Sequence, residues 1–402
     1  MCLQSLSLKV FFPTYILFQP VATVLIRKMG PRIFLSSICL LWGALMVGFG
    51  FVTNWVQLVP LRIVLGILEG GSFPGGIYLL SCWFTRFEIQ RRNSYYYMIG
   101  MIASAFSGIL AYGFTQMEGL AGIRGWRWIF IMEGIITCVV AIIAFWVIVD
   151  FPEKATKSFR FLNHREVDLV VARIEDDRKD VVLEEFNLRG YLANGLDVKV
   201  WSYALMFALA AIPTYGLAYF LPIILQTGLG YSVAKAQCLT APPQATSVLV
   251  MWVQAYYGDK KQIRGPWIAI NSILVLIGAP ILGFATNDAV RYFGVFLCAM
   301  GAYSQVPAIL TYQACNIRGQ WRRAFCSASL IGLSGVGAIA GTLVFRPEDA
   351  PGYHPGLIAL MVADGLVLVI LGGLTLSMWR ANKQADEGKR VIEGLDSFRY
   401  TL

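Results

Sequence analysis

Long apolar runs alternate with short polar loops along most of the chain. An α-helix needs about 20 mostly apolar residues to cross the hydrocarbon core of a bilayer, and most of these runs reach that length. We predict eleven membrane-spanning helices, at residues 11–26, 33–53, 56–84, 94–117, 127–149, 200–226, 238–257, 266–286, 290–314, 324–345 and 356–379. The hydrophobic pattern therefore predicts an all-α, polytopic membrane protein.

The charged residues are few and lie mainly in loops. Only 14% of the 402 residues are charged and 57% are hydrophobic, whereas a soluble globular protein carries about 25% charged residues. Most of the 33 Lys and Arg residues fall in one alternate set of loops, which includes the 150–199 connection and the C-terminal tail. Cytoplasmic loops carry such an excess. We therefore interpret the net charge of +9 as a signal for membrane orientation, with the C-terminus cytoplasmic, and not as a nucleic-acid-binding surface.

The 150–199 connection divides the chain unevenly. We expect a bundle of five helices within residues 1–149, a cytoplasmic central loop at 150–199, a bundle of six helices within 200–379 and a cytoplasmic tail at 380–402. The basic loops "RKMGPR" and "DKKQIRGP" occupy corresponding places in the two halves if the first half lacks its first helix. This recurrence indicates a duplicated plan of twelve helices minus the first, from a truncated gene model or isoform.

The central loop contains one amphipathic helix. In "NHREVDLVVARIEDDR", Glu166 follows Asn163 by three residues, as in a capping box. Apolar residues then recur at helical spacing, at Val167, Val170, Val171 and Ile174. We expect this helix to pack on the membrane domain from the cytoplasmic side.

The stretch "RIVLGILEGGSFPGGIYLL" places Arg62 and Glu69, seven residues apart, inside an apolar segment. Ionisable residues in such segments almost always face the bundle interior or a water-filled cavity. We hypothesise that Arg62 binds a substrate carboxylate, which a guanidinium matches in geometry, and that Glu69 carries a proton. The alternative is a structural pair of charges that holds neighbouring helices together.

Small residues mark faces where helices approach closely. The glycines and Pro74 after Glu69 favour close packing and a local weakening of the helix. Similar small-residue faces occur at Gly66/Gly70, Gly100/Ser104/Gly108 and Gly337/Gly341.

Further polar residues lie within or beside the apolar segments. Glu133 and Asp364 are additional candidates for the proton site, although Glu133 also has Arg127 near it in sequence. The candidates for substrate binding in the second half are Tyr215, Tyr219, Gln305 and Asn316, for which interhelical hydrogen bonding is the alternative. At the cytoplasmic end of one helix, Asp259, Lys260 and Arg264 are candidates for a gate.

Motifs of catalysis and cofactor binding are missing from the sequence. The two histidines, His164 and His354, are far apart, the eight cysteines form no C-x-x-C pair, and no Walker, Rossmann or H-E-x-x-H pattern occurs. We therefore predict no metal, no cofactor and no enzymatic activity.

Several strings resemble the major facilitator superfamily and, within it, the fungal anion:cation symporter family of allantoate permease-like proteins. They are "LRIVLGILEGGSFPGGIYLLSCWFTRFEIQRR", "GWRWIFIMEGI", "VDFPEKATKSFRFLNHRE", "FLPIILQTGLGYSVAKAQCLTAPP" and "FRPEDAPGYHPG". The chain departs from the superfamily pattern at its first basic loop, where Arg27 stands in place of the usual Asp, while the second loop keeps Asp259.

The resemblance implies two six-helix bundles around a central cavity and the uptake of a small organic anion, such as a carboxylate or a vitamin-like compound, together with protons. We expect a multi-pass protein of the plasma membrane whose partners are its substrate, protons and the lipid bilayer, with no obligate protein partner. The alternative is a non-transporting sensor or an inactive homologue that keeps the fold.

Overall fold

The computed structural model is helical throughout the residues that it describes, which are 2–85, 88–157, 162–178, 188–228, 230–350, 352–396 and 398–402. Within these ranges the β-structure is limited to one isolated bridge between Ile392 and Leu395. The chain divides into two compact units, and we describe each by itself. Unit 1 comprises Met1–Thr85 and Ser107–Leu183, and unit 2 comprises Arg86–Phe106 and Glu184–Leu402.

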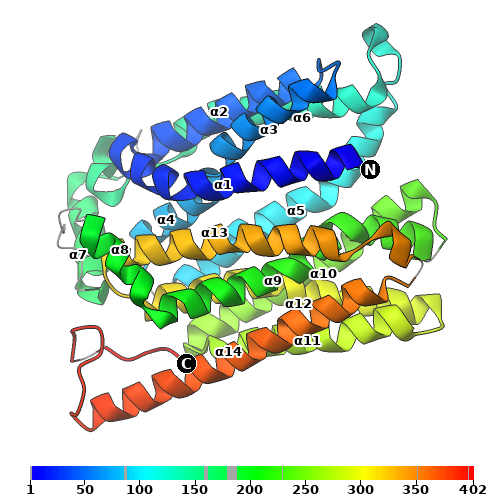
Figure 1. Ribbon diagram of the computed structural model, residues 1–402. Coiled ribbons are helices and arrows are strands. Elements are labelled where there is room, and N and C mark those ends of the chain that lie inside the picture. The colour runs from blue at the N-terminus through cyan, green and yellow to red at the C-terminus, as the bar shows by residue number, and fades with distance from the viewer. Residues whose placement is uncertain are drawn as a thin grey trace. The chain divides into compact units, whose positions relative to one another are not determined.

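The described part of unit 1 contains six α-helices and part of a seventh. Its helices are α1 (Cys2–Met29), α2 (Pro31–Phe49), α3 (Trp55–Glu69), α4 (Ser72–Trp83), α6 (Gly125–Val147) and α7 (His164–Arg178), together with the second part of α5 (Ile89–Thr115). The helix α2 packs closely against α6 and α3, and α1 packs against α3 (Figure 1). The helix α1 begins at Cys2, well before the predicted residue 11.

Unit 2 contains α8 (Leu188–Ala193), α9 (Val198–Ile223), α10 (Val233–Lys261), α11 (Gly265–Phe284), α12 (Asp288–Asn316), α13 (Gln320–Val344) and α14 (His354–Asp386). One π-helical turn, Ile224–Gly228, continues α9. The helix α9 packs against α13, α12 and α14, and α11 packs against α12 and α14 (Figure 1). The helix α14 extends beyond residue 379, so the first part of the predicted tail is helical.

The first part of α5 belongs to unit 2, although the sequence places this whole segment in the first bundle. Met98 and Met101 of α5 lie in the same buried cluster as Leu217, Leu221 and Ile224. These two methionines have little exposed surface, so burial of apolar side chains joins this part of α5 to unit 2. The boundary between residues 183 and 184 falls inside the predicted 150–199 connection.

Nine helical segments of the described chain are long and apolar enough to cross a membrane. They are Pro31–Phe49, Val56–Trp83, Arg91–Thr115, Gly125–Val147, Val198–Gly228, Gly265–Phe284, Asp288–Asn316, Trp321–Val344 and His354–Asp386. The helices α1 and α10 occupy the other two predicted segments. The all-helical fold is thus confirmed, while the number eleven stays a prediction.

The predicted weakening after Glu69 is a break between α3 and α4. The helix α3 ends at Glu69 and α4 begins at Ser72. Pro74 has no N–H with which to continue the hydrogen-bond ladder to the Gly70 carbonyl, which explains the interruption. The Ser72 hydroxyl instead donates to the Glu69 carbonyl over 2.9 Å.

Two of the three predicted glycine faces are close helix contacts. A Cβ atom at Gly66 would lie 2.3 Å from Thr14 Oγ1 of α1, and one at Gly337 would lie 2.0 Å from the Ala208 carbonyl oxygen of α9. Both positions therefore accept only glycine without movement of a neighbour. Gly100, by contrast, has no atom within 4 Å of a Cβ position. The structure therefore does not support a close contact at the Gly100 end of the Gly100/Ser104/Gly108 face.

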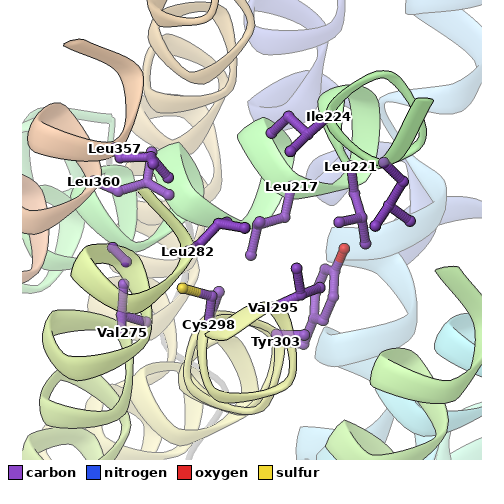
Figure 2. Packing of buried hydrophobic residues seen from close by; sticks show 14 of the residues in the cluster. Leu217, Leu221, Ile224, Val275, Leu282, Val295, Cys298, Tyr303, Leu357 and Leu360 are labelled. Atoms are coloured by element: carbon purple, nitrogen blue, oxygen red, sulfur yellow. The ribbon is translucent and has the colours of Figure 1, made fainter. Parts of the chain in front are cut away.

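The apolar core of unit 2 is formed by side chains from α5, α9, α11, α12 and α14. Leu217, Leu282, Val295 and Cys298 point toward one another in this cluster (Figure 2). Full burial of one Leu or Val side chain contributes about 1.5–3 kcal/mol. The helices that carry the polar residues of unit 2 are thus held in place by apolar packing.

The amphipathic helix predicted in the central loop is α7, which begins at His164 and packs against α4. The Glu166 carboxylate accepts a hydrogen bond from the Asn163 N–H over 2.8 Å, which is one half of the predicted capping box. Val167 and Ile174 are buried. The hydrophobic spacing correctly predicted this helix and its packing.

Candidate functional site

Arg62 and Glu69 lie on α3, and both side chains are half-buried. The Arg62 guanidinium carbon lies 5.0 Å from the centroid of the Phe49 ring, at the end of α2. Phe49 is fully buried and stacks against Phe130 of α6. Arg62 therefore points toward α2 and the interior of unit 1, and its charge acts on Glu69.

Glu69 occupies the last position of α3, immediately before the break. Interrupted helices at membrane depth occur where the backbone is buried in protein or lines a water-filled cavity. In many transporters such breaks carry the groups that bind ions and substrates. The sequence thus places a carboxyl group at an interruption of this kind, with Arg62 about 10 Å before it on the same helix.

Glu133 lies on α6 and is half-buried. Its backbone carbonyl accepts a hydrogen bond from the Thr137 hydroxyl over 2.7 Å. Arg127, its sequence neighbour, donates instead to the Val52 carbonyl over 2.8 Å. No ion pair joins Arg127 and Glu133 among the described residues, so the proposed local pairing is absent.

Asp364 of α14 is completely buried in unit 2. Its carboxyl group is faced by Gln305 of α12 and Ser272 of α11, both also without exposed surface. The Gln305 side-chain amide donates to the Ser272 hydroxyl over 2.8 Å. Neither carboxylate oxygen of Asp364 has a hydrogen bond of ordinary geometry within the described part of the chain. The structure thus joins two predicted candidates, Asp364 and Gln305, and adds Ser272.

The two predicted tyrosines of α9 stack on each other. The ring centroids of Tyr215 and Tyr219 are 6.4 Å apart and the rings are nearly parallel. Tyr219 is exposed, and Tyr215 is half-buried beside Tyr97 of α5. The pair presents an aromatic and hydroxyl-bearing strip on α9.

Asn316 ends α12 and binds the C-terminal tail. Its side-chain amide donates to the Thr401 carbonyl over 3.0 Å, and its side-chain oxygen accepts from the Thr401 N–H over 2.8 Å. Both halves of the amide are therefore used in a structural contact. These hydrogen bonds join the end of α12 to the tail, and substrate binding by Asn316 stays a prediction.

The predicted gate residues of unit 2 form a charged cluster at the end of α10. The Asp259 carboxylate pairs with the Arg264 guanidinium over 2.9 Å and accepts the Arg91 N–H of α5 over 3.1 Å. Burial raises the pKa of the Asp259 carboxyl, and the Arg264 charge opposes this rise. The Arg264 side chain is itself fully buried. Lys260 is exposed.

The described residues contain no group of three His, Cys, Asp or Glu side chains close enough together to hold a metal ion. Seven of the eight cysteines fall in the described side chains, and none of these seven is in a disulfide.

The sequence and the fold were compared with known proteins. Residues 4–342 match the family model of the Major Facilitator Superfamily. The chain belongs to this superfamily. It is 32% identical over 361 residues to an MFS-type transporter, cnsO, of Penicillium expansum, which covers 88% of this chain and 70% of the relative.

Two further matches place the chain within the superfamily. It is 28% identical to the high-affinity nicotinic acid transporter of Saccharomyces cerevisiae, over 96% of this chain and 70% of that protein. Its fold resembles the proton:xylose symporter XylE with a TM-score of 0.73 and 16% identity, over 94% of this chain and 86% of XylE. At that identity the second match supports the helical superfamily fold alone.

The sequence analysis of this superfamily member missed a charged network around Glu393 in the C-terminal tail. The Glu393 carboxylate pairs with Lys199 over 2.7 Å and with Arg322, and Arg322 also pairs with Asp197. The Tyr400 hydroxyl donates to Glu393 over 2.9 Å. The only signal in the sequence was the presence of charged residues in loops far apart along the chain.

Proposed function

We propose that this Major Facilitator Superfamily protein is a secondary transporter that carries a small organic anion together with protons by alternating access of two helical bundles. The observation on which the proposal rests is the pair Arg62 and Glu69 in unit 1. A carboxyl group at a helix break and an arginine that interacts with it from two turns earlier on α3 supply one group for a proton and one for an anion.

Arg62 is the group that we assign to the anion. Its guanidinium stays charged at any physiological pH and presents parallel N–H donors to a carboxylate. Its position over the Phe49 ring leaves it with an apolar surface on one side. The relative from Saccharomyces cerevisiae is named a nicotinic acid transporter, and nicotinic acid carries a carboxylate on a planar ring, which supports the assignment of the anion class.

Glu69 is the group that we assign to the coupled proton, with Glu133 and Asp364 as further candidates. Polar side chains of unit 2, namely Tyr215, Tyr219 and Gln305, are proposed to contribute hydrogen bonds to the substrate. We assign Asp259 and Arg264 to a gate that closes by their ion pair, with Lys260 at its exposed edge. The proposed location is the plasma membrane with a cytoplasmic C-terminus.

Uptake assays test the proposal. The full chain is expressed in yeast cells that lack uptake of the probe, and labelled nicotinate, allantoate and pantothenate are offered at several external pH values. We expect accumulation of at least one compound, faster at acidic pH. Arg62→Gln abolishes this uptake, whereas Arg165→Gln on the exposed face of α7 leaves it intact.

Coupling is tested with Glu69→Gln, and the exposed Glu153→Gln serves as its control. We expect Glu69→Gln to remove the dependence of uptake on external pH. Uptake that is indifferent both to pH and to this substitution would contradict proton coupling through Glu69. A chain that reaches the membrane and transports none of the three anions would favour the non-transporting sensor.

A further inference from the structure

The buried carboxyl group of Asp364 in unit 2 has an environment that no structural contact explains. Its two oxygens are shielded from solvent and lack hydrogen bonds of ordinary geometry, within the residues that the structure describes. An ionised carboxylate left in this state costs far more free energy than any packing contact returns. The group therefore requires either a proton or a bound cation.

The neighbouring side chains decide between these two ligands. The groups that face the carboxyl are the Gln305 amide and the Ser272 hydroxyl, both able to donate hydrogen bonds. The Gln305 N–H already donates to Ser272 over 2.8 Å. A metal cation needs several oxygen ligands, and no group of three His, Cys, Asp or Glu side chains forms a metal site around Asp364 in the described residues. The Gln305 Oε1 atom is buried without a hydrogen-bond partner in the described part of the chain and is an acceptor for a proton on Asp364. A proton on Asp364 needs no such set of ligands.

The same donors make the charged form attainable. Burial without a counter-charge favours the neutral acid, while the Gln305 amide and the Ser272 hydroxyl face the carboxyl and can donate hydrogen bonds to the carboxylate when it forms, which lowers its cost. A group whose two protonation states are close in free energy can take up and release a proton during a transport cycle.

Few titratable groups face Asp364 from the helices that pack against α14. From α12, the Cys298 thiol is a titratable group near enough for the charge of Asp364 to act on it. From α11 the facing group is the neutral Ser272. The helices α9 and α13 also pack against α14, and no ion pair joins either of them to Asp364 in the described ranges. Cys298 itself points into the apolar cluster (Figure 2).

We infer that Asp364, with Gln305 and Ser272, forms an exchangeable proton-binding site inside unit 2, separate from the Arg62 and Glu69 pair of unit 1. The inference rests on the proposed function, since the site gives the transporter a coupling proton in its second unit. Gln305 of α12 is also one of the side chains proposed to contribute a hydrogen bond to the substrate. Substrate contact with Gln305 would change the donors around Asp364 and so link substrate binding to proton release.

The protonation state is tested directly by infrared spectroscopy on the full chain reconstituted in lipid. We expect the carbonyl band of a protonated carboxylic acid to appear and disappear reversibly as the pH is changed. The band is lost in Asp364→Asn and retained in the control Asp168→Asn, whose side chain is exposed on α7. A spectrum without a titrating band, or one unchanged in Asp364→Asn, would overturn the inference.

Two milder variants keep the test valid if Asp364→Asn fails to fold. Ser272→Ala and Gln305→Met each remove a donor to the carboxylate but leave Asp364 in place. We expect each to move the titration midpoint of the band to higher pH, because the charged form loses a hydrogen bond. A merely structural role of these side chains predicts no such shift, and unchanged midpoints would refute the donor argument.

Transport provides the second readout. Each proton carried with the substrate lets an inward gradient of one pH unit support about tenfold more accumulation. In proteoliposomes with nicotinate as the probe, Asp364→Asn should lose this tenfold effect and retain exchange of labelled for unlabelled nicotinate. Accumulation in Asp364→Asn as large as that of the unmodified chain would sink the inference while leaving the proposed transporter, coupled through Glu69, intact. Replacement of sodium by choline distinguishes the cation: a band or an accumulation that needs sodium would overturn the assignment to a proton.

If the unmodified chain transports nothing, the proposed function fails and the infrared titration still decides whether Asp364 exchanges a proton.

Discussion

At the scale of single residues, glycines at helix contacts are the positions with the least room for change. The helices α9 and α13 approach so closely that a Cβ atom at Gly337 would overlap the Ala208 carbonyl oxygen, at 2.0 Å. Such contact stabilises a helix pair through close packing of the backbones. The lack of a side chain at Gly337, more than its hydrophobicity, allows this short distance between the two helices.

Gly337→Ala should destabilise unit 2 by about 1–3 kcal/mol, because the added methyl group forces the two backbones apart. The measurement is the thermal unfolding of the purified chain in detergent. The matched control is Gly372→Ala on α14, where no atom lies within 4 Å of the Cβ position. That substitution should be neutral or stabilising by up to about 1 kcal/mol. Equal melting temperatures for the two variants would contradict the packing explanation.

At the scale of elements, the C-terminal tail holds the ends of several helices of unit 2 together. The Asn382 side-chain amide of α14 donates to the Tyr400 carbonyl, and its side-chain oxygen accepts from the Tyr400 N–H, each over 2.8 Å. Thr401 bonds to Asn316 of α12, and the Leu402 carbonyl accepts the Arg264 N–H before α11 over 3.0 Å. The tail is therefore a structural part of the unit and not only a solvated extension.

The ion pair between Glu393 and Arg322 should contribute more to stability than an exposed pair does. A double-mutant cycle with Glu393→Gln and Arg322→Gln should give a coupling of about 0.5–3 kcal/mol, because Glu393 is only 5% exposed. The control pair is Lys389 and Glu387, at 2.7 Å and with side chains 71% and 40% exposed, for which we expect about 0–1 kcal/mol. A coupling in the first cycle no larger than that in the second would show that the tail network adds little.

Asp197, the residue that precedes α9, should make the stability of unit 2 sensitive to acid. Burial raises the pKa of its carboxyl, but hydrogen bonds from the Lys199 N–H and the Arg322 guanidinium outweigh burial and hold the pKa below its ordinary value. A carboxyl whose pKa is lower in the folded state stabilises the fold above its unfolded pKa of about 4 and loses this effect as the pH falls through the folded value.

Asp197→Asn should therefore lower the free energy of unfolding at neutral pH and flatten its decrease below about pH 4. Chemical unfolding at a series of pH values checks this outcome. The exposed Asp168→Asn should leave the pH profile unchanged. Parallel profiles for Asp197→Asn and the unmodified chain would contradict the assignment.

At the scale of the whole molecule, the excess of Lys and Arg in alternate loops predicts how the chain lies in the membrane. Positively charged loops remain cytoplasmic during insertion. An epitope tag after Leu402 should thus bind antibody only in permeabilised cells. A tag inserted after Gly122, in an exposed turn between α5 and α6, should bind antibody in intact cells. The opposite pattern would reverse the predicted orientation.

Hydrophobic length and local spacing in the sequence were enough to predict the membrane class, the all-helical fold, a local weakening after Glu69, the helix α7 and the contact faces of Gly66 and Gly337. These features depend on neighbouring residues, since a helix of lipid-compatible length and a glycine stripe are both local properties. The pattern also singled out Arg62, Glu69 and Asp364 because a charge is conspicuous among apolar residues. The residues that these three side chains contact in the fold could not be predicted from the sequence pattern.

Tertiary structure alone decided which distant groups meet. Glu393 finds Lys199 across 194 positions of the chain, and Asn316 finds Thr401 across 85. The same holds for the donors that face Asp364 and for the methionines of α5 in the core of unit 2. Such pairings follow from the packing of several helices at once, and no local pattern encodes them, because each partner on its own is an ordinary polar or apolar residue.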